Sequence, residues 1–454
     1  MQHVILGAGP AGVIAAETIR KQAPGDRVVL IGEEDEAPYS RMAIPYLLIG
    51  QVGEQGTHLR KGDAHFQKLG IELKRLRATS VDTAARSVKL SDGTQQSYDR
   101  LLIATGARPV RPPIQGLDLP NVHTCWTLAD ARAIMADVKP GSRVLQMGAG
   151  FIGCIIMEAL AQRVKGEGGQ LTVVEMGNRM VPRMMTEKAG AMIKAWCQKQ
   201  GVQVVTDAKV ESLQSGGSGG GGLLSKVVGM FSGGDNKADA DAPIHAKLSN
   251  GKTIGVDVVI VATGVKPNLE FLEGSGITCK DGILVDAAMQ TNVPGVYAAG
   301  DVINAVDFST GERSLNMIQP AAADEARIAA LNMLGGSTAS QGSLAMNVLD
   351  TLGLIASSFG QWWGADAKDG GRHVEHADDA AFKYLRLEFK GDTLIGATSL
   401  GWTNHVGVLR GLIQGQVKLG HWADKLIDDP TRVMEAYLAC SQQQNVWSSR
   451  ASTA

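Results

Sequence analysis

Two glycine-rich turns of the form Gly-x-Gly-x-x-Gly, about 140 residues apart, limit what this chain can fold into more than any other feature. Each turn follows a short apolar run typical of a buried strand, and each precedes an apolar helical pattern and a second apolar run. The order strand, tight turn, helix and strand predicts a βαβ unit, so the chain is expected to be an α/β protein with two such domains. The first unit would comprise a strand at 4–6, the turn 7–12, a helix at 13–22 and a strand at 27–31; the second would comprise a strand at 143–147, the turn 148–153, a helix to about 164 and a strand at 170–174.

Glycines at this spacing let the backbone approach a pyrophosphate closely, and the following helix offers free amides and the positive end of its dipole. An acid follows the second strand of each unit: Glu33 lies 21 residues after Gly12, and Glu175 lies 22 residues after Gly153. A carboxylate at this place accepts a hydrogen bond from a ribose 2′-hydroxyl and repels a 2′-phosphate. Both units are therefore predicted to bind dinucleotides, and the second is predicted to favour NADH over NADPH.

Two further segments extend this prediction. Residues 101–106 (LLIATG) and 259–264 (VIVATG) each combine a hydrophobic strand with a small-residue turn, which suits a chain that crosses between domains. Residues 291–301 (TNVPGVYAAGD) end in Gly300-Asp301, where a carboxylate beside a tight turn can hold a ribityl hydroxyl.

The ordered set GAGPAG, ATGARP, GAGFIG, ATGVKP and TNVPGVYAAGD resembles the flavoproteins with two dinucleotide-binding domains, the pyridine nucleotide-disulfide oxidoreductase family, over about residues 2–335. The resemblance implies two Rossmann-like domains in a glutathione reductase-like arrangement, with FAD and NAD(H) as cofactors. It implies an FAD-binding domain of residues 1–112 and 247–330, an NAD-binding domain of residues 113–246, and an α+β C-terminal interface domain of residues 331–454 that supports a homodimer.

The resemblance also assigns cofactor contacts to the residues that match the family's motifs. Residues 317–321 would cover the edge of the flavin ring. The loop 38–41 resembles one near the flavin pyrophosphate in the nitrite reductase, rubredoxin reductase and NADH oxidase branch, so Arg41 is either a phosphate contact or a surface arginine. The implied FAD contacts are Gly7, Gly9, Pro10, Ala11, Gly12, Glu33, Arg41, Val81, Ala104, Thr105, Gly106, Gly300, Asp301 and Gln319; the implied NAD contacts are Gly148, Gly150, Phe151, Ile152, Gly153, Glu175 and Gly264.

Two departures from the family bear on the chemistry. Aligned on Ile44-Pro45-Tyr46, Met42 stands where the NADH oxidase, NADH peroxidase and coenzyme A disulfide reductase branch carries a redox cysteine. A thioether forms neither a thiolate nor a sulfenate, so we expect a flavin-centred reaction without a catalytic side chain or disulfide reduction. Ile155 and Tyr46 stand where many relatives pair a glutamate with a lysine beside the flavin, and Glu158, one helical turn further on, could substitute in part.

Composition argues against several other classes of protein. The 44 Lys+Arg and 46 Asp+Glu give a net charge of −2 without a long basic run, which argues against a nucleic-acid-binding surface. The five cysteines form no CxxC, which argues against a dithiol motif, a metal site or a disulfide framework and favours a reducing compartment. No charged leader precedes the first strand, and no apolar run reaches the roughly 18 residues of a membrane span. We therefore expect a cytoplasmic protein without a transmembrane segment.

Residues 215–243 interrupt the second unit with a Gly- and Ser-rich stretch that predicts a flexible insertion. Apolar residues between 223 and 231 would fall on one side of a two-turn helix. A loop that collapses on itself or stays disordered is the first interpretation, and a docking or peripheral membrane-touching segment is the minority one.

Together these features predict an FAD-dependent NADH:acceptor oxidoreductase. Hydride would pass from NADH to flavin N5, and electrons would pass on singly to a protein carrier such as a ferredoxin, a rubredoxin or another iron–sulfur protein. A second hypothesis is reduction of a quinone or of dioxygen, and a third is a non-catalytic flavoprotein acting as a scaffold or redox-sensing subunit. The C-terminal tryptophans and histidines are expected to be core or interface residues: Trp362, Trp363, Trp402, Trp422, His405 and His421.

Overall fold

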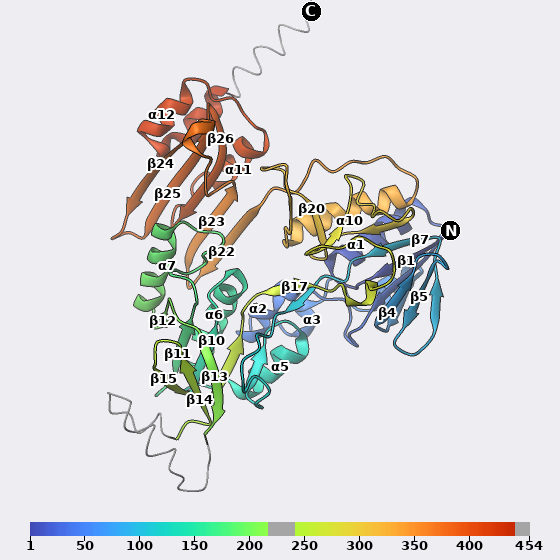
Figure 1. Cartoon of the computed structure of the whole chain (residues 1–454), viewed down its shortest axis with the longest axis horizontal. Coiled ribbons are helices and arrows are strands. Elements are labelled where there is room, and N and C mark those ends of the chain that lie inside the picture. The colour runs from blue at the N-terminus through green and yellow to red at the C-terminus, as the bar shows by residue number, and fades with distance from the viewer. Residues whose placement is uncertain (217–240, 441–454) are drawn as a thin grey trace, which may run out of the picture. The chain divides into compact units, whose positions relative to one another are not determined.

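The computed structural model describes residues 1–216 and 241–440, which fall into two compact units (Figure 1). The first unit contains residues 1–47, 52–108 and 265–346. The second contains residues 48–51, 109–264 and the chain from 347 onward.

A five-stranded parallel sheet forms the centre of the first unit, in the order β19-β7-β1-β2-β3. Helices α1 and α10 pack against each other and against strands of this sheet (Figure 1). The strands are apolar on both faces, as buried parallel strands require, and Leu101 and Leu102 are wholly buried. The elements are β1 (Gln2–Leu6), α1 (Pro10–Gln22), β2 (Arg27–Gly32), β3 (Ile71–Arg75), β7 (Arg100–Ile103), β19 (Val296–Ala298) and α10 (Gln319–Met333).

Smaller elements complete the first unit. One antiparallel sheet has the order β4-β5-β6, another small sheet has the order β18-β20-β21, and β8 pairs with β17. The elements are η1 (Arg41–Ala43), α2 (Ile44–Leu48), α3 (Glu54–Thr57), α4 (Ala64–Lys68), β4 (Ala78–Asp82), β5 (Ser87–Leu90), β6 (Gln95–Ser97), β8 (Ala107–Pro109), β17 (Val265–Pro267), η2 (Glu270–Leu272), β18 (Ile283–Leu284), β20 (Ile303–Val306) and β21 (Arg313–Ser314).

The second unit has its own five-stranded parallel sheet, in the order β12-β11-β10-β16-β9. An antiparallel sheet, β13-β14-β15, accompanies it. The elements are β9 (Val122–Thr124), α5 (Leu128–Asp137), β10 (Arg143–Met147), α6 (Phe151–Arg163), β11 (Gln170–Val174), α7 (Glu187–Lys199), β12 (Gln203–Val205), β13 (Val210–Ser215), β14 (Ile244–Leu248), β15 (Thr253–Val256) and β16 (Val258–Val261).

A five-stranded sheet in the order β22-β23-β26-β25-β24 lies in the C-terminal part of the second unit (Figure 1). Strands β23 to β26 pair in antiparallel fashion. The hydroxyl of Tyr384 in this sheet lies 3.1 Å from Oγ1 of Thr186, the N-cap of α7. The elements are β22 (Met346–Thr351), β23 (Leu354–Gly360), η3 (Ala367–Asp369), β24 (Gly371–Asp378), β25 (Lys383–Lys390), β26 (Thr393–Leu400), α11 (Val406–Gln414), α12 (Trp422–Asp428) and η4 (Pro430–Arg432).

The expected fold class is confirmed: two parallel Rossmann-like sheets and an antiparallel C-terminal sheet with helices. Helix α11 ends at Gln414, because Gly415 follows it and Gln416 adopts a left-handed φ of 47°. The strand at 258–261 pairs with β10 of the second sheet, so the first unit resumes at residue 265 and not at the expected 247.

The insertion expected at 215–243 is described only at its ends. Ser215 pairs with Ile244 across β13 and β14, and the amide of Gly216 donates to the carbonyl of Pro243 (2.8 Å). The apolar residues between 223 and 231 lie outside the described residues.

Truncation of Leu102 to alanine tests the buried centre of the first sheet. Because Leu102 is 0% exposed between β1 and β19, the variant should lose about 3 kcal/mol of unfolding free energy. Urea unfolding followed by circular dichroism measures this. Leu438→Ala is the matched control, since Leu438 is 50% exposed and should change the stability by less than about 0.5 kcal/mol; equal losses in both variants would contradict the assignment of the core.

Candidate functional site

The first and third glycines of both turns are required by the protein's own backbone. A Cβ on Gly7 would lie 2.0 Å from the carbonyl oxygen of Ala104, and one on Gly12 would lie 1.8 Å from that of Gly7. The second turn repeats the geometry: a Cβ on Gly148 would lie 2.4 Å from the oxygen of Ala262, and one on Gly153 would lie 2.6 Å from that of Gly148. These four glycines therefore let strand, turn and helix pack together.

The middle glycine of each turn has no such internal reason. Gly9 and Gly150 have φ values of −78° and −74°, which any residue adopts, and a Cβ on either would meet nothing within 4 Å. The fold therefore does not require glycine at these two positions. The open space beside each of them would let a ligand approach the backbone closely. The two turns thus fit the pyrophosphates of two dinucleotides.

The helices that follow the turns also begin in a way that suits an anion. Gly9 and Gly150 are the N-caps of α1 and α6 and supply no side-chain hydrogen bond, whereas Thr127 caps α5 and Thr186 caps α7. The first-turn amides of α1 and α6 therefore lack a capping side chain. Such amides and the helix dipole attract a phosphate.

The first unit brings several expected FAD contacts together around its turn. Gly7 meets Ala104, and a Cβ on Gly300 would lie 3.3 Å from that of Ala11 and 3.5 Å from that of Ala322. Gly300 has a left-handed φ of 81°, so its turn favours glycine. The turn 7–12, the segment 104–106, the Gly300-Asp301 turn and the start of α10 thus form one cluster.

Asp301 places a carboxyl group with a raised pKa in this cluster. Burial raises the pKa of its carboxyl to about 6, and the guanidinium of Arg41 acts in the opposite direction. Its carboxylate accepts no hydrogen bond from any residue in the part of the chain that the structure describes. A partly buried carboxylate with unused acceptors fits the hydroxyls of a ribityl chain.

Arg41 is tied to neighbours in its own loop. It donates to Glu34 (2.6 Å) and to the hydroxyl of Tyr39 (2.9 Å), and its side chain is 36% exposed. Glu33, at the end of β2, is exposed, and Gly32 beside it lies against Ala8 of the turn, where an added Cβ would come within 2.7 Å. Both residues belong to the same unit as the first turn.

The other expected FAD contacts differ in their surroundings. Asn268 holds the segment after β7 by donating from its side chain to the carbonyl of Thr105 (2.8 Å) and from its backbone to that of Gly106 (3.0 Å). Gln319, at the start of α10, is exposed and accepts from Ser40 (3.2 Å). Val81 is 4% exposed and belongs to the core of the first unit.

Glu175 defines the second site. One carboxylate oxygen accepts from the amide of Ala149 in the turn (2.7 Å), and the other accepts from the amide of Gly177 (2.8 Å). The negative charge is therefore fixed beside the turn by two backbone donors. Phe151 and Ile152 in the first turn of α6 are partly exposed, and Gly264 has a left-handed φ of 108°.

Two buried polar residues in these sites escaped the sequence analysis. Gln146 in β10 is fully buried beneath the second turn and donates to the carbonyls of Gly148 (2.8 Å) and Gly153 (3.0 Å). Glu325 in α10 accepts from the amide of Gly300 (2.9 Å). The available signal was a polar residue in an otherwise apolar strand in the first case, and an acid in an alanine-rich helix in the second.

The departures from the family are visible in the structure. Met42 in η1 is 48% exposed and Tyr46 in α2 is 53% exposed, so neither is part of the core. Burial raises the thiol pKa of Cys125 and Cys197 to about 12 and that of Cys154 well above its usual value, which leaves these thiols unactivated.

Glu158 in α6, which could substitute in part for the family's glutamate, is partly buried. Burial raises its pKa, and Asp350 of the C-terminal sheet adds to this effect. Its nearest described hydrogen-bond partner is Gln162, one turn along the same helix (3.3 Å).

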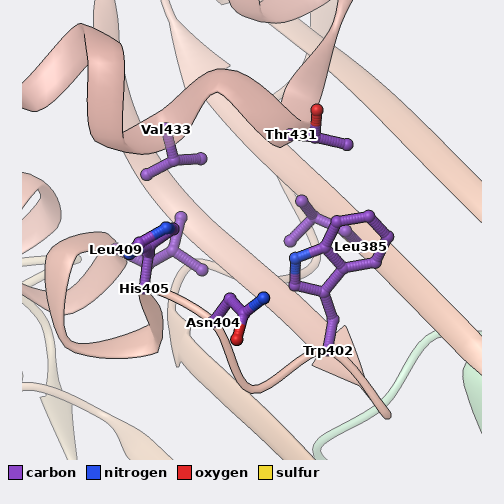
Figure 2. A pocket seen from close by; sticks show the side chains of 7 residues that line it. All are labelled: Leu385, Trp402, Asn404, His405, Leu409, Thr431 and Val433. Atoms are coloured by element: carbon purple, nitrogen blue, oxygen red, sulfur yellow. The ribbon is translucent and has the colours of Figure 1, made fainter.

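A cavity in the C-terminal part of the second unit involves none of the expected site residues (Figure 2). His405, which lines it, has a left-handed φ of 62°. In residues 1–216 and 241–440, no helix is long and apolar enough to cross a membrane, and no group of three or more His, Cys, Asp or Glu side chains is arranged to hold a metal ion. The cavity is lined by Leu385, Trp402, Asn404, His405, Leu409, Thr431 and Val433.

Alanine at the middle and at the last glycine of the first turn should separate ligand binding from folding. Gly9→Ala should leave the melting temperature of the flavin-free protein unchanged, because the new methyl enters open space. The same methyl should weaken FAD binding at least tenfold, because it would occupy the space in which the pyrophosphate is expected to lie. Gly12→Ala should lower the melting temperature, because its methyl would overlap the oxygen of Gly7. Calorimetry and flavin fluorescence titration measure the two effects; a Gly9→Ala variant with normal FAD affinity would contradict the placement of the ligand.

Replacing Asp301 with asparagine should stabilise the flavin-free protein. Burial raises the folded-state pKa of Asp301 from 3.8 to about 6, so its contribution to stability is present below about pH 4 and is lost as the pH rises through 6. Asp301→Asn should therefore be about 3 kcal/mol more stable than the wild type at pH 7.5 and only about 1 kcal/mol more stable at pH 4.5. Urea unfolding measures this, and Asp324→Asn, with an exposed carboxylate, should show no such gain.

Comparisons with known proteins agree with this geometry. The sequence model of the family described as "Pyridine nucleotide-disulphide oxidoreductase" matches residues 1–326. The chain is 32% identical to the ferredoxin–NAD(+) reductase component of the biphenyl dioxygenase system of Paraburkholderia xenovorans (strain LB400), over 73% of this chain and 74% of that protein. It is 28% identical to subunit epsilon of the NADH-dependent phenylglyoxylate dehydrogenase of Aromatoleum evansii, over 95% of this chain and 96% of that protein.

A solved structure gives the same fold. The ferredoxin reductase for the CYP199A2 system from Rhodopseudomonas palustris superposes with a TM-score of 0.80 over 96% of this chain and 99% of that chain, at 24% identity. The resemblance stated from the motifs is thus confirmed by the match over residues 1–326. The chain belongs to the pyridine nucleotide-disulphide oxidoreductase family and is an NAD(P)H-dependent flavin oxidoreductase.

Proposed function

We propose that this protein is an FAD-dependent NADH:acceptor oxidoreductase whose acceptor is an iron–sulfur protein. The observation that supports this proposal best is the lack of a redox cysteine near the first site. Met42, which is half exposed, stands at the position of the family's redox cysteine, and no cysteine lies in residues 38–46. A thioether cannot relay electrons by thiol chemistry. Electrons that reach the flavin therefore have to leave for an acceptor outside this chain.

The first unit supplies the residues that would hold FAD. The turn around Gly9 and the amides at the start of α1 would bind the pyrophosphate, Glu33 the adenosine ribose, and Asp301 the ribityl chain. Arg41 would contribute positive charge to the same face, since it already acts on Asp301. When bound, FAD supplies the chemistry of accepting two electrons as hydride and releasing them one at a time.

The second parallel sheet supplies the residues that would hold NADH. The open space at Gly150 and the uncapped start of α6 would receive the pyrophosphate. Glu175, fixed by the amides of Ala149 and Gly177, would accept from a ribose 2′-hydroxyl and repel a 2′-phosphate. The C-terminal sheet would form the interface of a homodimer, as the resemblance to the family implies.

The relatives support a protein acceptor. The protein of P. xenovorans is, by its name, a ferredoxin–NAD(+) reductase component of a dioxygenase system. The structural neighbour from R. palustris is, by its title, a ferredoxin reductase. A ferredoxin-type partner is consistent with a flavin site that has no redox-active side chain of its own.

A second candidate function comes from the extent of one match. The A. evansii protein is by name one subunit of a dehydrogenase, and the match covers 95% of this chain, beyond the 326 residues of the family match. The chain could accordingly be the NAD(H)-linked flavoprotein subunit of a larger dehydrogenase complex. In that case its iron–sulfur partner would be another subunit of the complex.

Anaerobic mixing of the flavin-loaded protein with NADH tests the dehydrogenase activity. The flavin absorbance should bleach within seconds; persistence of the oxidised spectrum would instead favour the scaffold or redox-sensing hypothesis. Reoxidation of the reduced protein should be faster with a ferredoxin or rubredoxin than with a quinone or dioxygen at equal concentration. Faster reoxidation by a quinone or by dioxygen would contradict the proposed acceptor.

Glu175→Ala tests the choice of nucleotide. Removing the fixed carboxylate should lower kcat/KM with NADH about tenfold or more and raise it with NADPH, because a ribose acceptor and a repulsive charge are both lost. Steady-state kinetics with both nucleotides measure the ratio. Glu187→Ala, an exposed acid in the first turn of α7, is the control, and an unchanged NADH/NADPH ratio in Glu175→Ala would contradict the assignment.

A further inference from the structure

Helix α10 buries an acid that the function described above does not use. Glu325 is 3% exposed, and it lies on the buried face of α10 with Ala321, Ala322 and Ala326. An alanine-rich face is the place where a helix packs closely, and α10 packs against α1. A carboxylate in such a place costs free energy unless it makes compensating contacts.

The contacts of Glu325 lead directly to the expected flavin site. Its Oε2 accepts from the amide of Gly300 (2.9 Å), and its Oε1 accepts from the hydroxyl of Ser343 (2.9 Å). Gly300 has the left-handed φ of the turn and immediately precedes Asp301. Glu325 therefore fixes the backbone turn that carries the Asp301 carboxylate.

The charges around the two acids are unbalanced. Burial raises the pKa of Glu325 to about 7; Asp301 and Asp324 add to this effect, and the bonds from Gly300 and Ser343 oppose it. Asp324 is exposed and paired with Arg327, so its charge is largely met by solvent and by that partner. Arg41 lowers the pKa of Asp301, whereas Asp301 and Asp324 are the charged groups among the main causes for Glu325, and both raise its pKa.

We propose that Glu325 is a positioning residue of the FAD site, which holds the Gly300 turn so that Asp301 meets the flavin and which releases the flavin more readily once it is ionised. This inference rests on the proposed binding of FAD at the first turn. The carboxyl oxygens of Glu325 hold the Gly300 turn by accepting a hydrogen bond. The negative charge of the ionised carboxylate weakens the binding of the flavin.

The direction of the pH effect follows from the charge of the ligand. The diphosphate of FAD is a dianion, so binding it near Asp301 favours the neutral form of a neighbouring acid. A ligand that prefers the protonated protein binds with uptake of a proton, and its dissociation constant rises with pH above the pKa of that acid. FAD should thus bind more weakly as the pH rises through 7, whereas the ionisation of Asp301 is largely complete at lower pH.

FAD titrations of the flavin-free protein between pH 6.5 and 8.5, followed by flavin fluorescence, test the inference. The dissociation constant of the wild type should rise about three- to tenfold over this range, since uptake of one proton allows at most a tenfold change per pH unit. Glu325→Gln keeps an acceptor but carries no charge, so it should match the wild type at pH 6.5 and vary less than about twofold with pH. Glu325→Ala loses both bonds and should bind FAD more weakly at every pH.

Matched variants keep the test decisive. Asp324→Asn removes an exposed charge from the adjacent position and should retain the pH dependence of the wild type. Ser343→Ala removes one hydrogen bond that favours ionised Glu325, so the pKa of Glu325 should rise. The midpoint of the pH dependence of FAD binding should then move to higher pH. This variant replaces Glu325→Gln in the test if Glu325→Gln does not fold. A wild-type affinity that is independent of pH, or a Glu325→Gln variant with the slope of the wild type, would overturn the inference. Failure of the wild type to bind FAD at any pH would overturn the proposed function instead.

Discussion

The structure depends on the contact of backbone with backbone at the two glycine-rich turns. Without a side chain at Gly7 and Gly12, the turn comes close to the carbonyl of Ala104 and the helix comes close to the turn itself. The same contacts recur at Gly148 and Gly153. This close packing leaves the start of each helix without a capping side chain and beside open space. The absence of side chains at these glycines therefore allows the fold to form and also leaves room for a ligand.

Each turn is then specialised by polar groups that differ between the two units. In the second, Glu175 is fastened to the turn by two amides, which gives a rigid negative charge suited to discriminating between nucleotides. In the first, the exposed Glu33 lacks this fastening, and two acids whose pKa burial raises, the partly buried Asp301 and the buried Glu325, lie at the Gly300 turn. Under the proposed function, a common scaffold would support one site that selects between nucleotides and one that holds FAD.

Several parts of the sites could be predicted because their signal is local. The turns, the strands beside them and the acids Glu33 and Glu175 lie within 35 residues of one another in each unit, so their spacing alone places them. The role of Glu325 and Ser343 was not predictable in the same way, because no motif spacing links them to the turn: the Gly300 amide donates to Glu325, and the Ser343 hydroxyl donates to Glu325 in turn. The sheet that β16 joins was not predictable for a related reason: its apolar pattern predicts a buried strand but does not say which sheet it pairs with.

The sequence by itself determined the two βαβ units, their family and the absence of a cysteine from residues 38–46, because each depends on residue identity at short range. Only the tertiary structure decided which glycines serve the fold and which face open space, since a Cβ clash depends on where the folded backbone places other atoms, such as the carbonyl oxygen of Ala104 beside Gly7. It also decided that Glu325 lies behind the Gly300 turn and that burial, rather than a neighbouring charge, is the main cause of its raised pKa. Burial is a property of the packed molecule, and no spacing of residues along the chain specifies it.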